Sequence, residues 1–583
     1  MGTRDQGTDT NVGSAGSVSM DGWTLPALVR HAAVTHGNRE FLAFEDGRTV
    51  TFAEFDELTD RLATALADIG LQPGDRLLGL LTNSAEFMLL MIATHKRRAI
   101  FVPVNTDLRG AFLEHQVRNS EPRIVAVDRG LLSRFDDVAA PAGAADETAA
   151  GLAARAALEP DWRIETTLLA DDGDAHPSGE ATGGVSAGSA LAGTTVLPLE
   201  QLLGTEPRVD AVLEAEPSDV CTIMYTSGTT GPAKGVLMPQ AHCYLFGLTA
   251  AQRLEITPDD RFFCCMPLFH ANGLFMQIYA ALHGGASAYV TKRFSVGQWL
   301  DTVIDQGITL TNALGVMPEF IWRTPPTDRD RDHRLRAVIA LPVAAEWAAA
   351  FEQRFGVRIV QGYGMTEVNM VAYTDPADPV MSGCAGPPLD EYFEVIVADP
   401  ATDLPLSPDE IGEILVRPKV PFCFNVGYHQ MTGKTVEAWR NLWFHTGDAG
   451  RIDEAGRLHF VDRLNDRIRR RGENISSYEV ETVINGYDGV IESAVVGLRV
   501  QGAGGEDEVL AVVAVDGSPP NPVEFLDWCV PRMPRHSVPR YLQFVPELDK
   551  TASGKIRKQA IRDAGVTGDL WDRESVGYTV ARG

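Results

Sequence analysis

The chain has 583 residues, of which 44% are hydrophobic and 22% charged, and its formal net charge at pH 7 is -28. This composition is typical of a globular protein, and the length predicts more than one domain. Such an acidic surface argues against nucleic acid as the main partner, because binding to a phosphate backbone depends on lysine and arginine. The sequence has no secretory signal, no myristoylation motif and no run of about 18 apolar residues, so we expect a cytoplasmic protein without a membrane span.

Segments of helical and strand character alternate from Thr51 onward. Apolar residues recur at helical spacing in FAEFDELTDRLATALADIG and AEFMLLMIATHKRR, and short apolar strand candidates lie in RLLGLL, AIFVPVN and RIVAVD. Short strands that alternate with helices of this length are typical of βαβ units. We therefore expect an α/β fold, in which a large N-terminal body of mainly parallel sheets is flanked by helices.

The alternation stops between about Leu131 and Leu199. This stretch is rich in alanine, glycine and aspartate and has few large apolar residues. We expect a low-complexity surface insertion near 131–199, at least partly disordered and without a core element. Beyond it the alternation resumes, with strand candidates in VCTIMYT, RFFCCMP, ASAYVT, TLTNALG, AVIALP and RIVQGYG.

The character of the chain changes near Asp462 and Arg463. The following segment, DRIRRRGENISSYEVETVINGY, is basic and then helical from about Ser477. Strand candidates come next in ESAVVGLR and VLAVVAV, with a helix candidate in PVEFLDWCV. We predict a disordered tail over 1–21, a large body over 22–462 that contains the insertion, and a small, mobile α+β lid domain over 463–583.

The stretch YTSGTTGPAKGV, from Tyr225 to Val236, combines small, hydroxylated and flexible residues with a single lysine. A flexible linker has a similar composition, but a linker need not follow a buried strand or carry a lone cation. Backbone N–H groups, hydroxyls and a lysine arranged around an anion form a phosphate cradle. The order differs from a Walker A loop, because Lys234 is followed by Gly235 rather than by serine or threonine.

Four further motifs follow this stretch along the chain: QGYGMTE (361–367), HTGDAG (445–450), DRLNDRIRRRGENISSYEVE (462–481) and KTASGKIRK (550–558). Together with YTSGTTGPAKGV, these five motifs in order resemble those of the adenylate-forming superfamily, which includes acyl-CoA synthetases, luciferases and peptide-synthetase adenylation domains. The similarity extends from about Gly22 to Asp563, apart from the insertion. PVNTDLRG and RRGENISSYEVE are most similar to medium-chain, aromatic or crotonobetaine-type acyl-CoA ligases.

The resemblance implies an ATP- and Mg²⁺-dependent, AMP-forming ligase. Such an enzyme converts a carboxylic acid to acyl-AMP and pyrophosphate and then transfers the acyl group to the thiol of coenzyme A. A carboxylate, with a reference pKa of about 4, is already a nucleophile at neutral pH, so no Ser-His-Asp arrangement is expected. The adenylation step needs positioning and neutralisation of charge on the phosphates.

The resemblance also implies roles for individual residues of the nucleotide site. Glu367 would hold Mg²⁺ and Thr366 the α-phosphate, while Tyr363 would stack on adenine. Asp448 would bind both ribose hydroxyls, assisted by Arg463. Taken singly, Glu367 is better explained as a carboxylate at a helix N-terminus, but the joint order of the motifs favours the functional interpretation. The cradle for the β- and γ-phosphates would consist of Thr226, Ser227, Gly228, Thr229, Thr230, Gly231 and Lys234.

The lid would supply the remaining parts. Lys555 would bridge the carboxylate and the α-phosphate, although by itself it is also explained as a solvated surface charge. Asn465, two residues after Arg463, stands where the family usually has a hinge lysine or aspartate. Asparagine tolerates a positive φ and so suits a pivot. Gly472 and the RRRGEN strand would line the channel for the thiol of coenzyme A.

His270, in MPLFHANGL, stands at the acyl entrance of the family, where we count it among the catalytic residues; a hydrogen-bonded core histidine is an equal alternative. Two departures from the family favour an unusual acid. IALPVAAEW replaces a glycine-rich turn, so Leu341 reshapes the adenine edge or the acyl pocket, and Arg98 replaces a common glycine. The other candidate wall residues are Asn272, Gly273, Asn312, Gly315, Met317 and Val343.

Other functions stay open at this level. The acceptor could be the phosphopantetheine of a carrier protein or an amine, and the acid could be nitrite, activated for diazotisation of an aryl amine. An inactive nucleotide-binding scaffold is a third hypothesis, but a scaffold needs no bridging lysine such as Lys555. The sequence does not specify the small-molecule acid, because one methylene changes binding by only about 1–3 kcal/mol. A homodimer is the default assembly.

Overall fold

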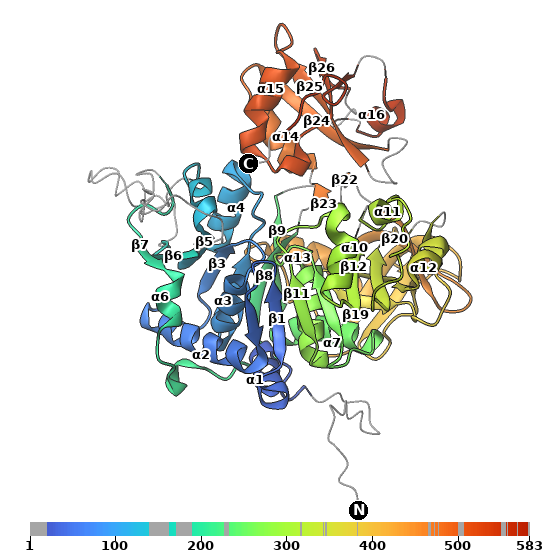
Figure 1. Ribbon diagram of the computed structural model, residues 1–583. Helices are drawn as coiled ribbons and strands as arrows, with labels where there is room; N and C mark the ends of the chain where they lie inside the picture. Colours follow the sequence, from blue (N-terminus) through green and yellow to red (C-terminus); the bar gives the residue numbers. More distant parts are fainter. Residues whose placement is uncertain are drawn as a thin grey trace, which may run out of the picture.

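The computed structural model consists of a large body below and a small lid above (Figure 1). No helix in the described part of the chain is long and apolar enough to cross a membrane. The structure describes residues 20–138, 162–170, 189–226, 232–314, 317–341, 343, 347–381, 383–463, 468–470, 473–475, 477–499, 507–549, 556, 558–567 and 570–580.

The first sheet of the body has the strand order β7-β6-β5-β3-β4-β8-β9, in which β9 is antiparallel to β8 and the other pairs are parallel. Its strands are β3 (Arg76–Leu80), β4 (Ile100–Pro103), β5 (Ile124–Asp128), β6 (Thr166–Ala170), β7 (Thr195–Pro198), β8 (Val220–Thr226) and β9 (Lys234–Pro239). The helical segments of this part are α1 (Leu25–His36), α2 (Phe52–Asp68), α3 (Ala85–Lys96), α4 (Gly110–Ser120), η1 (Arg129–Phe135), α6 (Leu199–Leu203) and η2 (Val209–Ala211).

The second sheet has the order β14-β13-β12-β10-β11-β1-β2, with parallel pairs except for the β1–β2 hairpin. Its strands are β1 (Glu40–Phe44), β2 (Thr49–Thr51), β10 (Arg261–Cys264), β11 (Ser287–Val290), β12 (Leu310–Leu314), β13 (Ala337–Leu341) and β14 (Arg358–Val360). The helical segments beside it are α7 (Gln240–Arg253), α8 (Ala271–Gly273), η3 (Leu274–Tyr279), α9 (Ala280–Gly284), α10 (Val296–Asp305), α11 (Met317–Trp322) and α12 (Ala348–Phe355).

These two sheets confirm the expected α/β class. The sequences of the flanking helices explain where they begin and how deeply they are buried. Helix α2 begins with a capping box, in which Thr51 Oγ1 accepts from the backbone N–H of Glu54 and the Glu54 carboxylate accepts from the N–H of Thr51. Helix α3 is buried on all sides, with every residue buried except Glu86, as expected of a helix enclosed by the core rather than lying on the surface.

The expectation that 131–199 contains no core element is wrong. Strands β6 and β7 lie in this range and extend the first sheet beyond β5. The short run TTLLA of β6 is buried throughout and pairs in parallel register with β5. A strand of five residues between polar, alanine-rich segments gives too little periodicity to be recognised in the sequence. Residues 139–161 and 171–188 lie outside the described residues.

A third sheet, wholly antiparallel, was not singled out in the sequence. Its order is β17-β21-β20-β19-β18, and the hairpin β15–β16 lies next to it. The elements of this part are β15 (Gly362–Met365), β16 (Asn369–Tyr373), β17 (Cys384–Gly386), β18 (Phe393–Ala398), β19 (Gly412–Pro418), α13 (Thr432–Ala438), η4 (Arg440–Leu442), β20 (Phe444–Ile452) and β21 (Leu458–Arg463).

The lid is an α+β unit, with the hairpin β22–β23 nearest the body and α16 at its outer edge (Figure 1). Its sheet has the order β24-β25-β26-β27. The elements are β22 (Ile468–Arg470), β23 (Glu473–Ile475), α14 (Ser477–Asn485), β24 (Val490–Arg499), β25 (Asp507–Val515), α15 (Pro522–Cys529), η5 (Val530–Arg532), η6 (Arg535–Ser537), β26 (Tyr541–Val545), α16 (Lys558–Ala564) and β27 (Trp571–Asp572).

One buried cation ties helices α2 and α3 together. The side chain of Lys96 is fully buried, and its Nζ lies 2.6 Å from both Asp56 Oδ1 and Asp60 Oδ1. The two carboxylates are partly exposed, at 20% and 33%. The charge on the lysine is therefore compensated without burying either acid completely.

We expect Lys96→Met to lower the free energy of unfolding by about 3 kcal/mol, because it leaves two adjacent carboxylates without their cation. Lys434→Met is the matched control, because Lys434 pairs with Glu437 on an exposed helix face and such pairs contribute about 0.5 kcal/mol or less. Urea unfolding followed by circular dichroism measures both. Equal losses in the two variants would contradict a stabilising role for the buried cation.

Candidate active site

A cavity of about 750 Å³ lies between the body sheets and the lid. Thr226, Leu314 and Leu341, the last residues of β8, β12 and β13, are part of its wall. Ligands of α/β proteins bind at the carboxyl ends of parallel strands, where loops leave the sheet. Residues of the third sheet and of the lid complete the wall, so the cavity is formed where separate parts of the fold meet.

The carboxylate of Glu367 is the centre of a polar cluster on this wall. The residue is 1% exposed, and its Oε1 accepts hydrogen bonds from Thr226 Oγ1 at 3.0 Å and from Tyr428 Oη at 3.2 Å. Lys234 Nζ in turn donates to Tyr428 Oη at 3.2 Å and lies 4.2 Å from the centre of that ring. Thr226 and Lys234 face each other in the β8–β9 ladder, so one register brings both to the acid.

Burial changes the ionisation of this cluster. It lowers the pKa of Lys234, although the nearby Glu367 charge opposes the shift. It also raises the pKa of Tyr428, and Glu367 adds to that rise. The tyrosine therefore keeps its proton and donates it to the carboxylate. The lysine gains from any further anion that approaches, since its ammonium is poorly solvated.

The backbone beside Glu367 is fixed by buried side chains. His242 Nε2 donates to the Thr366 carbonyl at 3.0 Å, and Asn425 Nδ2 donates to the Glu367 carbonyl at 2.8 Å. Asn369, at a positive φ of 76°, donates from Nδ2 to the His242 carbonyl. Burial lowers the pKa of His242 to about 3, so its imidazole is neutral at neutral pH.

Tyr363 and Asp448 form a second polar element of the cavity wall. Tyr363 Oη donates to Asp448 Oδ2 at 2.8 Å, and both residues are buried, at 6% and 4% exposure. The Tyr363 ring is roughly parallel to that of Phe460, with centroids 6.0 Å apart. Asp448 pairs with Arg463 in the β20–β21 ladder, although the side chain of Arg463 lies outside the described part.

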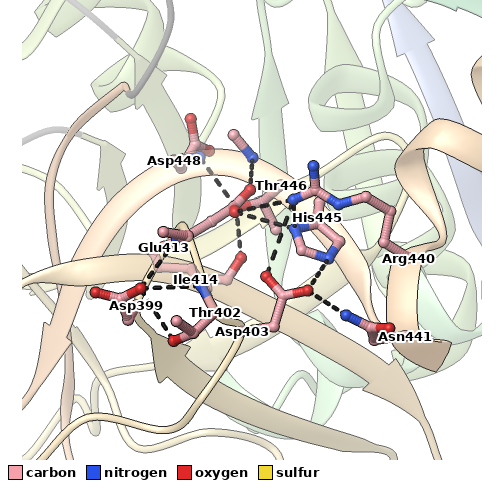
Figure 2. Close-up of polar contacts among 12 residues, drawn as sticks. Asp399, Thr402, Asp403, Glu413, Ile414, Arg440, Asn441, His445, Thr446 and Asp448 are labelled. Atoms are coloured by element: carbon pink, nitrogen blue, oxygen red, sulfur yellow. Dashed lines mark hydrogen bonds and ion pairs between the residues drawn. The ribbon is translucent and has the colours of Figure 1, made fainter.

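The irregular part of β20 that carries Asp448 is held by a polar network from β19 and η4 (Figure 2). Thr446 Oγ1 donates to the Ile414 carbonyl at 2.7 Å and accepts from the Asp448 N–H at 3.1 Å. Glu413 Oε1 accepts from the Gly447 N–H at 3.0 Å, and its Oε2 lies 3.0 Å from His445 Nδ1. These contacts fix the backbone of this bulge in the strand, including Gly447 at a φ of 70°.

The lid closes the cavity through polar contacts near His270. His270 Nε2 lies 3.5 Å from Glu473 Oε2 on β23. Burial raises the pKa of Glu473, but the His270 charge and hydrogen bond, with a smaller effect of His536, lower it to about 2. Glu473, Ile475 and His536 of the lid are part of the cavity wall, as is His270 itself.

The predicted wall residues meet at the same cavity. Asn272, Met317, Leu341 and Val343 line it, while Asn312 donates from Nδ2 to Asn272 Oδ1 at 3.1 Å. Gly273 lies behind them, at a point where a Cβ atom would stand 2.7 Å from the Pro267 carbonyl oxygen. Outside the described residues are Ser227, Gly228, Thr229, Thr230, Gly231, Gly315, Asn465, Gly472 and Lys555.

Sequence reasoning missed several residues that the site depends on. Tyr428, His242 and Asn425 hydrogen-bond to Glu367 or to the backbone beside it, and Glu413 accepts from the backbone next to Asp448. Tyr428, His242 and Asn425 all lie outside the five motifs. Glu413 follows a glycine at the start of an apolar strand and is buried in the structure. A single acid at the start of an apolar run can be recognised in the sequence, because acids are rarely buried without a partner.

Two family models match the chain over most of its length. The model for the AMP-binding enzyme family matches residues 29–421, and that for the C-terminal domain of AMP-binding enzymes matches residues 479–555. The chain belongs to the AMP-binding enzyme family. The resemblance to the adenylate-forming superfamily, read from the motifs, is thereby confirmed.

Individual AMP-binding enzymes are similar over nearly the whole chain. A feruloyl-CoA synthase of an Amycolatopsis species is 31% identical over 91% of this chain and 95% of its own. A crotonobetaine/carnitine–CoA ligase of Salmonella paratyphi B is 27% identical over 93% of this chain and 99% of its own length. The structure of o-succinylbenzoate CoA synthetase from Bacillus subtilis has a TM-score of 0.73 at 23% identity, covers 92% of this chain and 98% of that one, and shows the fold alone.

The buried His242 makes the stability of this AMP-binding enzyme depend on pH. The unfolded chain protonates this imidazole below about pH 6.5, whereas the folded protein does so only near pH 3, so acidification favours unfolding. We expect this residue to lower the free energy of unfolding by about 1 kcal/mol per pH unit between pH 6 and 5. His242→Gln, which keeps an N–H donor but does not titrate, should remove that part of the slope in urea unfolding.

The control is His31→Gln on the exposed face of α1. It should leave the difference between the unfolding free energies at pH 6 and pH 5 as it is in the wild type. If His242→Gln keeps the full wild-type slope, the buried imidazole is not the group that titrates.

Proposed function

We propose that the protein is an ATP- and Mg²⁺-dependent carboxylate–CoA ligase. The observation that carries the proposal is the buried Glu367 carboxylate, which accepts from Thr226 on the cavity wall and is linked to Lys234 through Tyr428. Tyr363 and Asp448 face the same cavity. Family membership and the CoA ligases among the similar proteins support this activity, with the small-molecule acid still to be identified.

The residues present fit a magnesium–nucleotide complex. Within the described residues, no three histidine, cysteine or carboxylate side chains gather as a metal site. Mg²⁺ is usually held by one or two carboxylates together with substrate phosphates. Glu367, which accepts hydrogen bonds from the hydroxyls of Thr226 and Tyr428, offers one buried carboxylate ligand of this kind. Lys234, from the end of the glycine-rich loop, supplies positive charge for phosphates beside it.

The adenosine moiety would be held by Tyr363 and Asp448. The tyrosine ring is a buried aromatic surface at the cavity, suited to stacking on adenine. The Asp448 carboxylate is suited to accept hydrogen bonds from ribose hydroxyls. Glu413 and Thr446 fix the backbone at Gly447 and Asp448 without a ligand, so binding would require less conformational entropy to be lost there.

Two half-reactions explain why a small domain stands over the cavity. In the first, Lys555 would neutralise charge between the carboxylate and the α-phosphate, with Thr366 on the α-phosphate. In the second, β23 would form one side of the path by which the thiol of coenzyme A reaches the acyl-adenylate, with Gly472 beside it. Strand β23 lies at the cavity, whereas α16, which starts at Lys558, lies at the outer edge of the lid (Figure 1). This arrangement suits the second step, in which β23 rather than the segment before α16 would act.

The first test is pyrophosphate release with ATP and Mg²⁺ over a panel of short, medium-chain, aromatic and amino-aromatic acids, with and without coenzyme A. We expect at least one acid to give release that is faster with coenzyme A and yields a thioester, detected by mass spectrometry. Nitrite with an aryl amine is included as a negative comparison. Pyrophosphate release at the same rate with and without coenzyme A for every acid would contradict the ligase proposal. The absence of pyrophosphate release with every acid would contradict it as well.

Two lid variants should separate the half-reactions. Lys555→Ala should slow ATP–pyrophosphate exchange by about 10²–10³-fold, the usual effect of removing one group that stabilises developing charge. Glu473→Gln should leave this exchange near the wild-type rate. It should slow thioester formation from pre-formed acyl-adenylate by about fivefold, because a partly exposed ion pair contributes about 1 kcal/mol.

Binding of ATP, measured by calorimetry, serves as the control and should be nearly unchanged in both lid variants. Unaltered exchange in Lys555→Ala would contradict the lysine assignment. Equal slowing of both half-reactions in Glu473→Gln would show that this contact supports the fold of the lid instead of its position in the second step.

A further inference from the structure

Helix α4 hydrogen-bonds to both legs of the β8–β9 pair. Nε2 of His115, on this helix, lies 2.8 Å from the carbonyl oxygen of Ala233. A carbonyl can only accept, so this ring nitrogen carries the proton and donates. Asn119 of the same helix accepts, through Oδ1, from Tyr225 Oη at 2.7 Å. His115 and Asn119 are four residues apart and therefore share one face of the helix.

The two contacts fall directly beside two residues of the predicted phosphate cradle. Tyr225 precedes Thr226 at the end of β8, and Ala233 precedes Lys234 at the start of β9. Thr226 and Lys234 are partners in the ladder between these strands. A buried carbonyl needs a donor in any case, so either contact alone would be ordinary. Together they fix both strands next to the two side chains that would meet the phosphates.

The contact of Tyr225 depends on a close approach between the two strands. Gly235 is the ladder partner of Tyr225, and a Cβ atom there would stand 3.3 Å from the tyrosine ring and 2.7 Å from Ile223 Cγ2. The ring also meets that of His115 edge to face, with centroids 6.3 Å apart. Burial raises the pKa of Tyr225, so the hydroxyl keeps the proton that it donates to Asn119. The glycine that distinguishes this stretch from a Walker A loop is thus explained by packing.

Helix α4 is itself fixed to the body. Phe112, Leu113 and Val117 are buried in one apolar cluster with strand residues such as Val102 and Val125. A side chain on a packed helix is held more precisely than one on a loop. The helix can therefore act as a rigid support for the ends of β8 and β9.

We infer that His115 and Asn119 are positioning residues for the binding of the β- and γ-phosphates of ATP. This inference rests on the proposed function. Neither residue is part of the cavity wall, so both act through the strand ends that carry Thr226 and Lys234. Strand ends held in place before binding lose less conformational entropy when the phosphates arrive. AMP has no β- or γ-phosphate, so its affinity should not depend on this support.

The test compares MgATP with AMP, each titrated by calorimetry into the wild-type protein and into His115→Leu. We expect His115→Leu to bind MgATP about fivefold more weakly, the usual effect of losing one hydrogen bond, and AMP within about twofold of wild type. His115→Gln keeps an N–H donor and should restore most of the MgATP affinity.

Three outcomes of this titration would overturn the inference. The first is an unchanged MgATP affinity in His115→Leu. The second is equal weakening of MgATP and AMP, which would mean that the helix only supports the fold. The third is a glutamine variant that binds MgATP as weakly as the leucine variant, because the hydrogen bond would then not be the cause.

Tyr225→Phe tests the contact to Asn119 with little change of shape. It should weaken MgATP by about threefold and leave AMP near the wild-type affinity, since only one neutral hydrogen bond is lost. His31→Leu, on the exposed face of α1, is the matched control for His115→Leu and should keep both affinities. An unchanged MgATP affinity in Tyr225→Phe would overturn the role of Asn119.

Lys234→Met separates this inference from the proposed function. Its ammonium would contact the phosphates directly, so we expect at least about tenfold weaker MgATP binding. If Lys234→Met weakens MgATP but His115→Leu does not, the proposed function stands and the inference fails. If the wild-type protein does not bind MgATP, or if Lys234→Met binds it normally, the phosphate site fails and the inference is overturned with it.

Discussion

The buried carboxylate of Glu367 is the constraint on which the rest of the site depends. An ionised acid at 1% exposure is costly unless hydrogen bonds and positive charge compensate it. Thr226 comes from β8 in the first sheet, and Tyr428 comes from the segment before α13. Because Tyr428 also accepts from Lys234, the acid is linked to both β8 and β9. Its hydrogen bonds therefore bring together the first sheet, the β15–β16 hairpin and the segment before α13.

The lid is attached to the body in a different way. At the cavity its contact is the partly exposed pair of His270 and Glu473, with side-chain exposures of 41% and 27%. Apolar residues such as Met533 belong to the same cluster as body residues such as Phe112. Modest, partly polar interfaces between domains permit relative motion. The body site is fixed by buried hydrogen bonds, whereas the lid contacts the body through one partly exposed polar pair at the cavity and through apolar residues beside it.

Much of the fold could be predicted from the sequence because parallel strands buried on both faces give continuous apolar runs. This holds for β3, β5 and β13, but not for β6 and β7, whose short runs lie among low-complexity segments. The site was predictable where motifs carry the chemistry, as for Glu367 and Asp448. Tyr428 was not, because a single tyrosine in a loop has no pattern until the fold brings it to a carboxylate.

Departures from local rules also need the structure before they can be interpreted. For Arg98, the position favours a structural explanation over a mark of a specialised substrate or partner: it has a φ of 52°, where glycine is common, and pairs with Asp219 at 2.8 Å, and it is not part of the cavity wall. The π-helix after Gly273 is a departure of another kind, because it places Gln277 against Asn272, a residue of the cavity wall. A strained or irregular element is informative about function only when it positions a side chain at a site. By that criterion Arg98 marks a turn after α3, whereas the π-helix positions a side chain of the cavity wall.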